Sequence, residues 1–151
     1  TENRKIHDSD IFVDGCGLLI PLTSGDPPID EMGTKDDPVN AWYWRADTED
    51  KPYNTIAEGL STTRFSEQCP IEAKSVRGER TWSVVFARKL AVPEQEKETA
   101  QLAPGGTVKI GFAVWEGANG ERAGVKSFSG YPSMVLVFKI DPRTSMTDGG
   151  A

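Results

Sequence analysis

A cationic, glycine-rich loop is the feature of this sequence best suited to hold a ligand. Residues 116–124 contain three glycines and Asn119 within nine positions, a composition that predicts a tightly folded loop rather than a helix. Two cations, Arg122 and Lys126, lie in or just after this loop, between two apolar segments. Because a guanidinium group pairs with anions and a neutral amine can donate to a metal, the loop predicts a binding site at the mouth of a β-structure.

A second loop carries the other donor atom of interest. Residues 23–38 read TSGDPPIDEMGTKDDP, which is too rich in proline and aspartate to continue a strand or a helix. Long loops in small domains are usually functional or mobile. Met32 is its single large apolar residue besides Ile29, and a thioether is a soft ligand for reduced iron. His7 is the one histidine and the natural rival donor, although it lies in a charged segment near a terminus.

The elements that position these loops are expected to be short strands. In Val39–Ala46 the alternation places Trp42 and Trp44 on one face and Tyr43 on the other. A tight hairpin turn is predicted at Arg77–Arg80. The turn residues Asp14–Gly17 predict a strand with a kink or bulge, and we expect a loop at Asp47–Gln68 and a surface connection at Val92–Gly106. The remaining strands are predicted at Ile11–Val13, Gly17–Leu22, Ile71–Val76, Thr81–Leu90, Val108–Val114 and Met134–Ile140, followed by a polar tail from Asp141 to Ala151.

This pattern predicts an all-β, antiparallel β-sandwich that forms one domain over residues 1–151. A formal charge of −6 and a pI near 4.8 argue against nucleic acid as a partner. No apolar run approaches the roughly 20 residues that span a bilayer, so no direct membrane span is expected. The sequence contains no nucleophile elbow and no phosphate-binding loop, which argues against an enzyme.

Two cysteines, Cys16 and Cys69, belong to no Cys-x-x-Cys-His motif, which excludes the usual covalent attachment of a c-type haem. A zinc site is equally disfavoured. The two cysteines either form one disulfide in an oxidising compartment or remain free thiols, and their spacing leaves both open.

Three segments resemble a known family. The stretch AVWEGANGERAGVKS (113–127) resembles the signature of the haem b-binding γ subunits of the type II dimethyl sulfoxide reductase family. That family includes the ethylbenzene and dimethylsulfide dehydrogenases and the chlorate and selenate reductases, with related subunits in nitrite oxidoreductases. The segments 32–46 and 82–88 resemble the same family, so that the likeness extends from about Ile11 to Phe138.

The resemblance implies a function and a set of ligands. Lys126 falls at the family's lysine haem ligand, and Met32 falls at its methionine ligand, in front of the strand PVNAWYW. The haem b would be non-covalent and held by long loops at one end of the sandwich, with Arg122, Asn119, Trp42 and Trp115 as further cofactor-binding residues. Val125 stands where the family often has a second cation, which affects propionate binding rather than axial ligation.

The implied role is electron transfer between the iron–sulfur β subunit of a molybdenum complex and a soluble c-type cytochrome. Catalysis would belong to the molybdenum α subunit, and the complex would be periplasmic or otherwise extracytoplasmic. The resemblance also implies that some of the family's N-terminal sequence is missing from this chain.

Each of these residues also has a simpler explanation. A methionine in a loop is more often a core residue, a loop lysine is usually solvated, and Arg122 or Arg45 could form surface ion pairs with Glu121 or Asp47. One alternative function is a haem-free carbohydrate- or ligand-binding sandwich that uses Trp42, Trp44 or Trp115 as a stacking platform. Another is an assembly subunit that has lost its haem.

Overall fold

The structure, a computed structural model, describes residues 12–28, 30–122, 125–130 and 133–135. His7, most of the predicted Met134–Ile140 strand and the predicted polar tail lie outside the described residues. The strands are β1 (Gly15–Pro21), β2 (Val39–Arg45), β3 (Tyr53–Ala57), β4 (Thr63–Phe65), β5 (Glu72–Arg77), β6 (Trp82–Ala87), β7 (Thr107–Lys109), β8 (Gly111–Trp115), β9 (Ser127–Phe128) and β10 (Ser133–Val135). Two single-turn 3₁₀ helices, η1 (Pro93–Gln95) and η2 (Gly117–Asn119), interrupt the loops.

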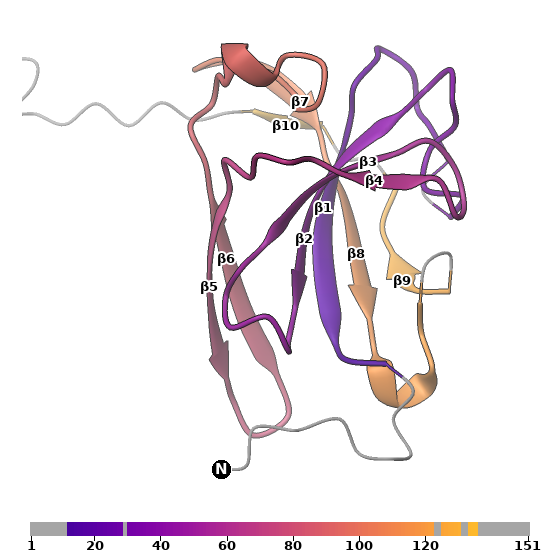
Figure 1. The fold of residues 1–151 in the computed structure, drawn as a ribbon, viewed down its shortest axis with the longest axis vertical. Helices are drawn as coiled ribbons and strands as arrows, with labels where there is room; N and C mark the ends of the chain where they lie inside the picture. Colours follow the sequence, from indigo (N-terminus) through magenta and orange to yellow (C-terminus); the bar gives the residue numbers. More distant parts are fainter. Residues whose placement is uncertain (1–11, 29, 123–124, 131–132, 136–151) are drawn as a thin grey trace, which may run out of the picture.

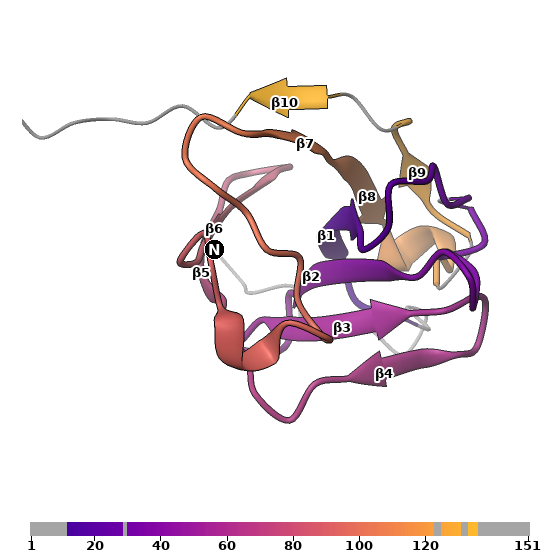
Figure 2. The ribbon, with the colours of Figure 1, turned by 90° about the horizontal axis from the view of Figure 1, so that it is seen from above.

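One large sheet organises the molecule. Its six strands follow the order β4-β3-β2-β1-β8-β9, and all neighbouring strands are antiparallel. Figure 2 shows this sheet curling from β4 through β2 and β1 towards β8 and β9. Because side chains alternate along a strand, the sheet has two distinct faces. We call them the hairpin face, which carries Leu18, Ile20, Trp42 and Trp44, and the loop face, which carries Leu19, Val39, Ala41, Ala57 and Ala113.

The β5–β6 hairpin covers the hairpin face and completes the sandwich (Figure 1). Ile20 and Trp42 pack with Ile71 of the adjoining segment and Phe86 of β6 in one apolar cluster. The predicted turn between the two strands is present, since the Gly78 N–H donates to the Thr81 carbonyl at 2.8 Å. The prediction of an all-β sandwich is therefore confirmed, as is the strand pairing on either side of the Arg77–Arg80 turn.

Several predictions about local structure were wrong. The kink or bulge expected at Asp14–Gly17 does not interrupt the strand, because β1 runs without a break from Gly15 and pairs with strands on both sides. The Asp47–Gln68 segment is not a featureless loop, because it contains β3 and β4. The connection at 92–106 is more than a surface link, since Val92, Thr99 and Ala100 are buried. Its buried end is held by Asn40 of β2, whose side-chain oxygen accepts from the Ala100 N–H at 3.1 Å.

The two candidate loops lie on the side of the sheet away from the hairpin. Both views place the 22–38 loop and β9 there, with the β5–β6 hairpin opposite (Figures 1 and 2). Among the described residues, no helix has the length and apolar character required to cross a bilayer. Cys16 is half-buried in β1 and Cys69 is exposed, and both are free thiols in the structure.

Candidate functional site

Met32 is seated on the loop face. Its side chain is only 8% exposed and packs in a cluster of buried residues that comprises Leu19, Val39, Ala41, Ala57, Ala113 and Trp115. Its backbone has φ 61°, in the left-handed region that few residues other than glycine adopt. A loop residue with an apolar side chain is therefore pressed against the sheet rather than exposed, and the loop closes over this face.

The loop face combines a floor of small residues with aromatic side chains. Gly17 lies opposite Ala113, and Leu19 lies opposite both Ala41 and Gly111, so much of the floor has little or no side chain. An aromatic row crosses the same face, with successive ring centroids 5.1, 6.2 and 5.2 Å apart; its members are Phe65, Tyr53, Tyr43 and Trp115. A low floor with apolar and aromatic walls is the kind of surface on which a flat, apolar cofactor binds.

Lys126 reaches the Met32 loop from the far edge of the sheet. Its Nζ donates to the Asp30 carbonyl at 3.3 Å, two residues before Met32, and lies 5.5 Å from the centroid of the Phe128 ring. Burial lowers the pKa of Lys126, and the nearby negative charge of Asp30 opposes that shift. The fold thus joins two segments that are 94 positions apart in the sequence.

The glycine-rich loop is held largely by its own residues. Glu121 accepts the Glu116 N–H at 2.8 Å, and Glu116 in turn accepts from the Asn119 side chain at 3.1 Å. The Arg122 guanidinium is exposed and lies 5.0 Å from the centroid of the Phe12 ring. Asn119 and Arg122 are therefore on the loop that leads to Lys126, but the described contacts do not bring either to Met32.

The two predicted tryptophans lie on opposite faces of the large sheet. Trp115 is on the loop face, where it shares the cluster with Met32 and packs over Gly17. Trp42 is on the hairpin face, with its Nε1 donating to Asn40 at 3.3 Å. The fold therefore brings Trp115, and not Trp42, to the Met32 cluster; a cofactor role for Trp42 stays a prediction.

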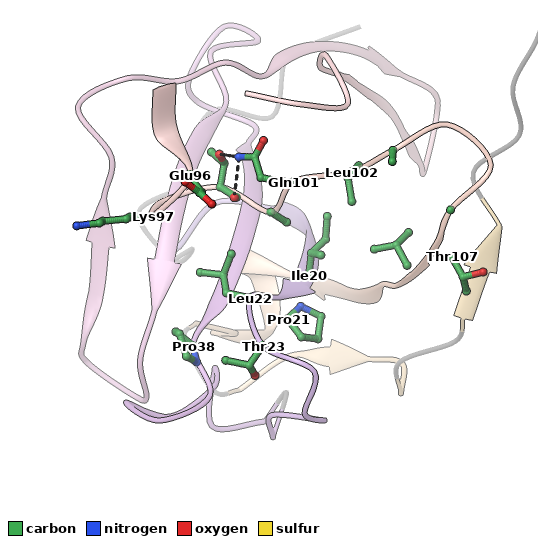
Figure 3. Close-up of a pocket in the computed structure, with 15 residues that line it drawn as sticks. Ile20, Pro21, Leu22, Thr23, Pro38, Glu96, Lys97, Gln101, Leu102 and Thr107 are labelled. Atoms are coloured by element: carbon green, nitrogen blue, oxygen red, sulfur yellow. Dashed lines mark hydrogen bonds between the residues drawn. The ribbon is translucent and has the colours of Figure 1, made fainter. Parts of the chain in front are cut away.

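Among the cavities that described residues line are three that include neither Met32 nor Lys126 in their walls. The first, of about 670 Å³, lies between the end of β1 and the 96–108 segment; Figure 3 shows Ile20, Leu22 and Leu102 lining it while Lys97 points away. The second, of about 460 Å³, is lined by residues that include Cys16, Arg77 and Trp82. The third, of about 840 Å³, lies beside Phe65 and the 93–98 segment.

Cys16 borders the second cavity without being reactive. Burial raises the pKa of its thiol to about 11, so the thiol is protonated at neutral pH. The described residues hold no cluster of three or more histidine, cysteine or acidic side chains arranged to bind a metal ion.

Sequence reasoning missed the contribution of β3 and β4 to the loop face. Ala57 packs with Met32, Tyr53 and Phe65 extend the aromatic row, and the Gly59 N–H donates to the Met32 carbonyl at 3.2 Å. The run Tyr53-Asn54-Thr55-Ile56-Ala57 contains the β-branched and aromatic residues of a strand, and that signal could have revealed β3.

This arrangement defines a class of protein: an all-β domain in which two loops meet over one face of a sheet. A sequence model of the family described as ethylbenzene dehydrogenase matches residues 71–127, a range that includes Trp115, Asn119, Arg122 and Lys126 but not Met32. Curated relatives match more of the chain. A putative respiratory nitrate reductase heme subunit, ORF7, of Haloferax mediterranei is 38% identical over 130 residues, which are 85% of this chain and 45% of the relative.

Two further relatives are γ subunits. The chlorate reductase subunit gamma of Ideonella dechloratans is 35% identical over 127 residues, 84% of this chain and 52% of the relative. The dimethylsulfide dehydrogenase subunit gamma of Rhodovulum sulfidophilum is 30% identical over 120 residues, 75% of this chain and 44% of the relative. The chain thus spans about half the length of these relatives. The matches confirm the resemblance of this chain to the γ subunits of the type II dimethyl sulfoxide reductase family.

Proposed function

We propose that this chain is the haem b-binding electron-transfer subunit of a molybdenum oxidoreductase complex. The observation that carries the proposal is the meeting of the two candidate ligand segments, with Lys126 Nζ 3.3 Å from the carbonyl of Asp30, two residues before Met32. The relatives support it, because one is named a heme subunit and two are named γ subunits of a reductase and a dehydrogenase. The chain would carry electrons while another subunit performs the catalysis.

The side chains present fit a haem. Met32 and Lys126 would hold the iron through a thioether and an amine. An amine ligates only when it is deprotonated, and burial lowers the pKa of Lys126 in that direction. Trp115 and the small residues of the loop face would offer apolar contact, and the exposed Arg122 is one cation of the loop that leads to Lys126 that could pair with a propionate. When bound, the haem supplies a one-electron iron couple.

The partners and the compartment complete the proposal. Electrons would pass between an iron–sulfur β subunit, itself bound to a molybdenum α subunit, and a soluble c-type cytochrome. We infer a periplasmic or other extracytoplasmic location. The free thiols Cys16 and Cys69 provide no support for that location, since the structure does not join them.

The carbohydrate-binding alternative loses its stacking platform in this fold. Sugar stacking needs exposed rings, whereas Trp42, Trp44 and Trp115 are 9%, 2% and 7% exposed. Their packing in the core favours the haem subunit over a lectin-like module that would use these rings.

The test is a reduced-minus-oxidised visible spectrum of the purified protein and of matched variants. Met32→Leu removes the thioether with little change of volume, and Lys126→Gln removes the amine. The exposed Lys35, in the same loop as Met32, serves as the control in Lys35→Gln. We expect a b-type spectrum that is changed in Met32→Leu and in Lys126→Gln and unchanged in Lys35→Gln. No spectrum after haem addition to the wild-type protein would refute the proposal, and it would leave the haem-free assembly subunit as the explanation.

A further inference from the structure

The backbone of Met32 is in a conformation that its neighbours must maintain. Met32 has φ 61° and is followed by Gly33 with φ 79°, so two consecutive residues are left-handed. A side-chain-bearing residue in this region is strained, and such strain persists only where surrounding contacts over-determine the geometry. The contacts that hold the Met32 backbone are therefore functional candidates.

Those contacts come from the end of β3 and from the loop itself. The Met32 carbonyl accepts from the Gly59 N–H at 3.2 Å, and the Gly33 N–H donates to the Pro28 carbonyl at 2.9 Å. The Gly33 backbone lies so close to β3 that an added Cβ would be 2.9 Å from the Ala57 carbonyl oxygen. The peptide group between Met32 and Gly33 is thus held through both its carbonyl and its N–H, and the bond to the carbonyl crosses to the β3–β4 turn.

The β3–β4 turn is itself fixed at the residue that makes this bond. Gly59 has φ 129°, a conformation open to glycine and closed to other residues. Its carbonyl accepts twice from Thr62, from the backbone N–H at 3.2 Å and from Oγ1 at 2.8 Å. Thr62 therefore stabilises the turn conformation in which the Gly59 N–H points toward the Met32 carbonyl.

We propose that the β3–β4 turn, through Gly59 and Thr62, is the positioning element that holds Met32 in place as an axial ligand. This inference rests on the proposed function and adds two residues that would act through the Met32 backbone. A tethered loop loses less conformational freedom when its side chain ligates, so the tether raises the fraction of iron that is bound by methionine. Neither Gly59 nor Thr62 belongs to the glycine-rich loop or to the segment around Lys126.

The consequence is measurable with imidazole, which competes with a protein ligand for ferric haem. Gly59→Ala forces the turn out of its φ 129° geometry and weakens the bond to the Met32 carbonyl. We expect the apparent affinity for imidazole to rise about fivefold, the factor that corresponds to one hydrogen bond of ordinary net strength. Thr62→Val removes only the Oγ1 bond, and we expect a smaller rise of about twofold from this partial loosening. Thr62→Ser keeps the hydroxyl and is expected to behave as the wild type.

A matched glycine separates the tether from general backbone strain. Gly105 is also left-handed, with φ 72°, and an added Cβ would meet nothing within 4 Å. Gly105→Ala therefore introduces backbone strain at a positive φ, without a steric clash, in a loop that makes no described contact with Met32. We expect its imidazole affinity to equal that of the wild type, whereas a role of Gly59 in stability alone would make the two alanine variants behave alike.

The outcomes distinguish this inference from the function on which it rests. A folded, haem-loaded Gly59→Ala protein with wild-type imidazole affinity would overturn the inference while Met32→Leu still reports a ligand. If Gly59→Ala does not fold, the Thr62 pair decides: equal affinities for Thr62→Val, Thr62→Ser and the wild type also overturn it. A wild-type spectrum that Met32→Leu leaves unchanged would overturn the ligand assignment and the inference together.

Discussion

The buried amide of Asn40 supports a prediction about the stability of the whole sandwich. Asn40 is fully buried in β2, and its side chain is shared between the large sheet and the 92–106 connection. Its Nδ2 donates to Asn54 Oδ1 at 2.7 Å and to the Thr55 carbonyl at 3.1 Å, while its Oδ1 accepts from the Ala100 N–H at 3.1 Å. The Asn40 side chain therefore links three parts of the chain, namely β2, β3 and the 92–106 connection.

Asn40→Leu keeps a similar volume and removes every one of these bonds. The Ala100 N–H and Asn54 Oδ1 lose a partner inside the core, and a buried polar group without a partner costs about 1–3 kcal/mol. Counting only these two short bonds, we expect the free energy of unfolding to fall by about 2–5 kcal/mol. Because the free energy of unfolding of a folded domain is only about 5–15 kcal/mol, this loss is a large fraction of the total stability.

Urea unfolding of the haem-free protein measures this difference, with Gln68→Leu as the control. Gln68 is also an amide whose oxygen accepts a hydrogen bond, from Gln95 Nε2 at 3.0 Å, but it is exposed. We expect the control to change the free energy of unfolding by no more than about 0.5 kcal/mol. A loss below about 1 kcal/mol in Asn40→Leu would refute the reasoning that the amide joins the connection to the sheet.

Three further predictions concern Gly17 and Cys16 of the central strand β1. Gly17→Val should lower the free energy of unfolding by about 1–3 kcal/mol through overpacking, because an added Cβ would lie 3.1 Å from the Trp42 carbonyl oxygen. Thermal denaturation checks this against Gly130→Ala, where a Cβ meets nothing within 4 Å. At pH 8, iodoacetamide should modify exposed Cys69 far faster than Cys16, whose burial raises its thiol pKa to about 11; equal rates by mass spectrometry would contradict that burial. Because burial disfavours the Cys16 thiolate, the folded protein keeps this proton to a higher pH than the unfolded chain does. The free energy of unfolding should therefore fall as the pH rises from about 9, the thiol pKa in the unfolded chain, towards 11.

The strands that sequence reasoning found are those in which apolar side chains alternate. In β2, Trp42 and Trp44 do lie on one face and Tyr43 on the other, and the β5–β6 hairpin forms around its predicted turn. β3 escaped because its buried positions include Asn54 and Thr55, which are 1% and 2% exposed. Polar residues that are buried through hydrogen bonds are indistinguishable from loop residues in a hydrophobic pattern.

The candidate site shows a similar division. The turn-forming residues place the 23–38 and 116–124 segments in loops. The sequence pattern does not, however, indicate that Met32 and Lys126 lie close together. That pairing came from the family resemblance, and the fold supplies the contact between Lys126 and the Asp30 carbonyl. Gly59 could not have been singled out, since its role depends on a hydrogen bond between two loops that are distant in the sequence.

X-ray absorption at the iron edge of the haem-loaded, reduced protein tests the central claim most directly. If Met32 and Lys126 ligate the iron, we expect one sulfur atom bonded to iron in the wild-type protein, with nitrogen as the remaining scatterer. We expect that sulfur to be lost in Met32→Leu. Iron bonded only to nitrogen or oxygen in the wild-type protein, or sulfur that persists in Met32→Leu, would contradict the assignment of Met32 as a ligand.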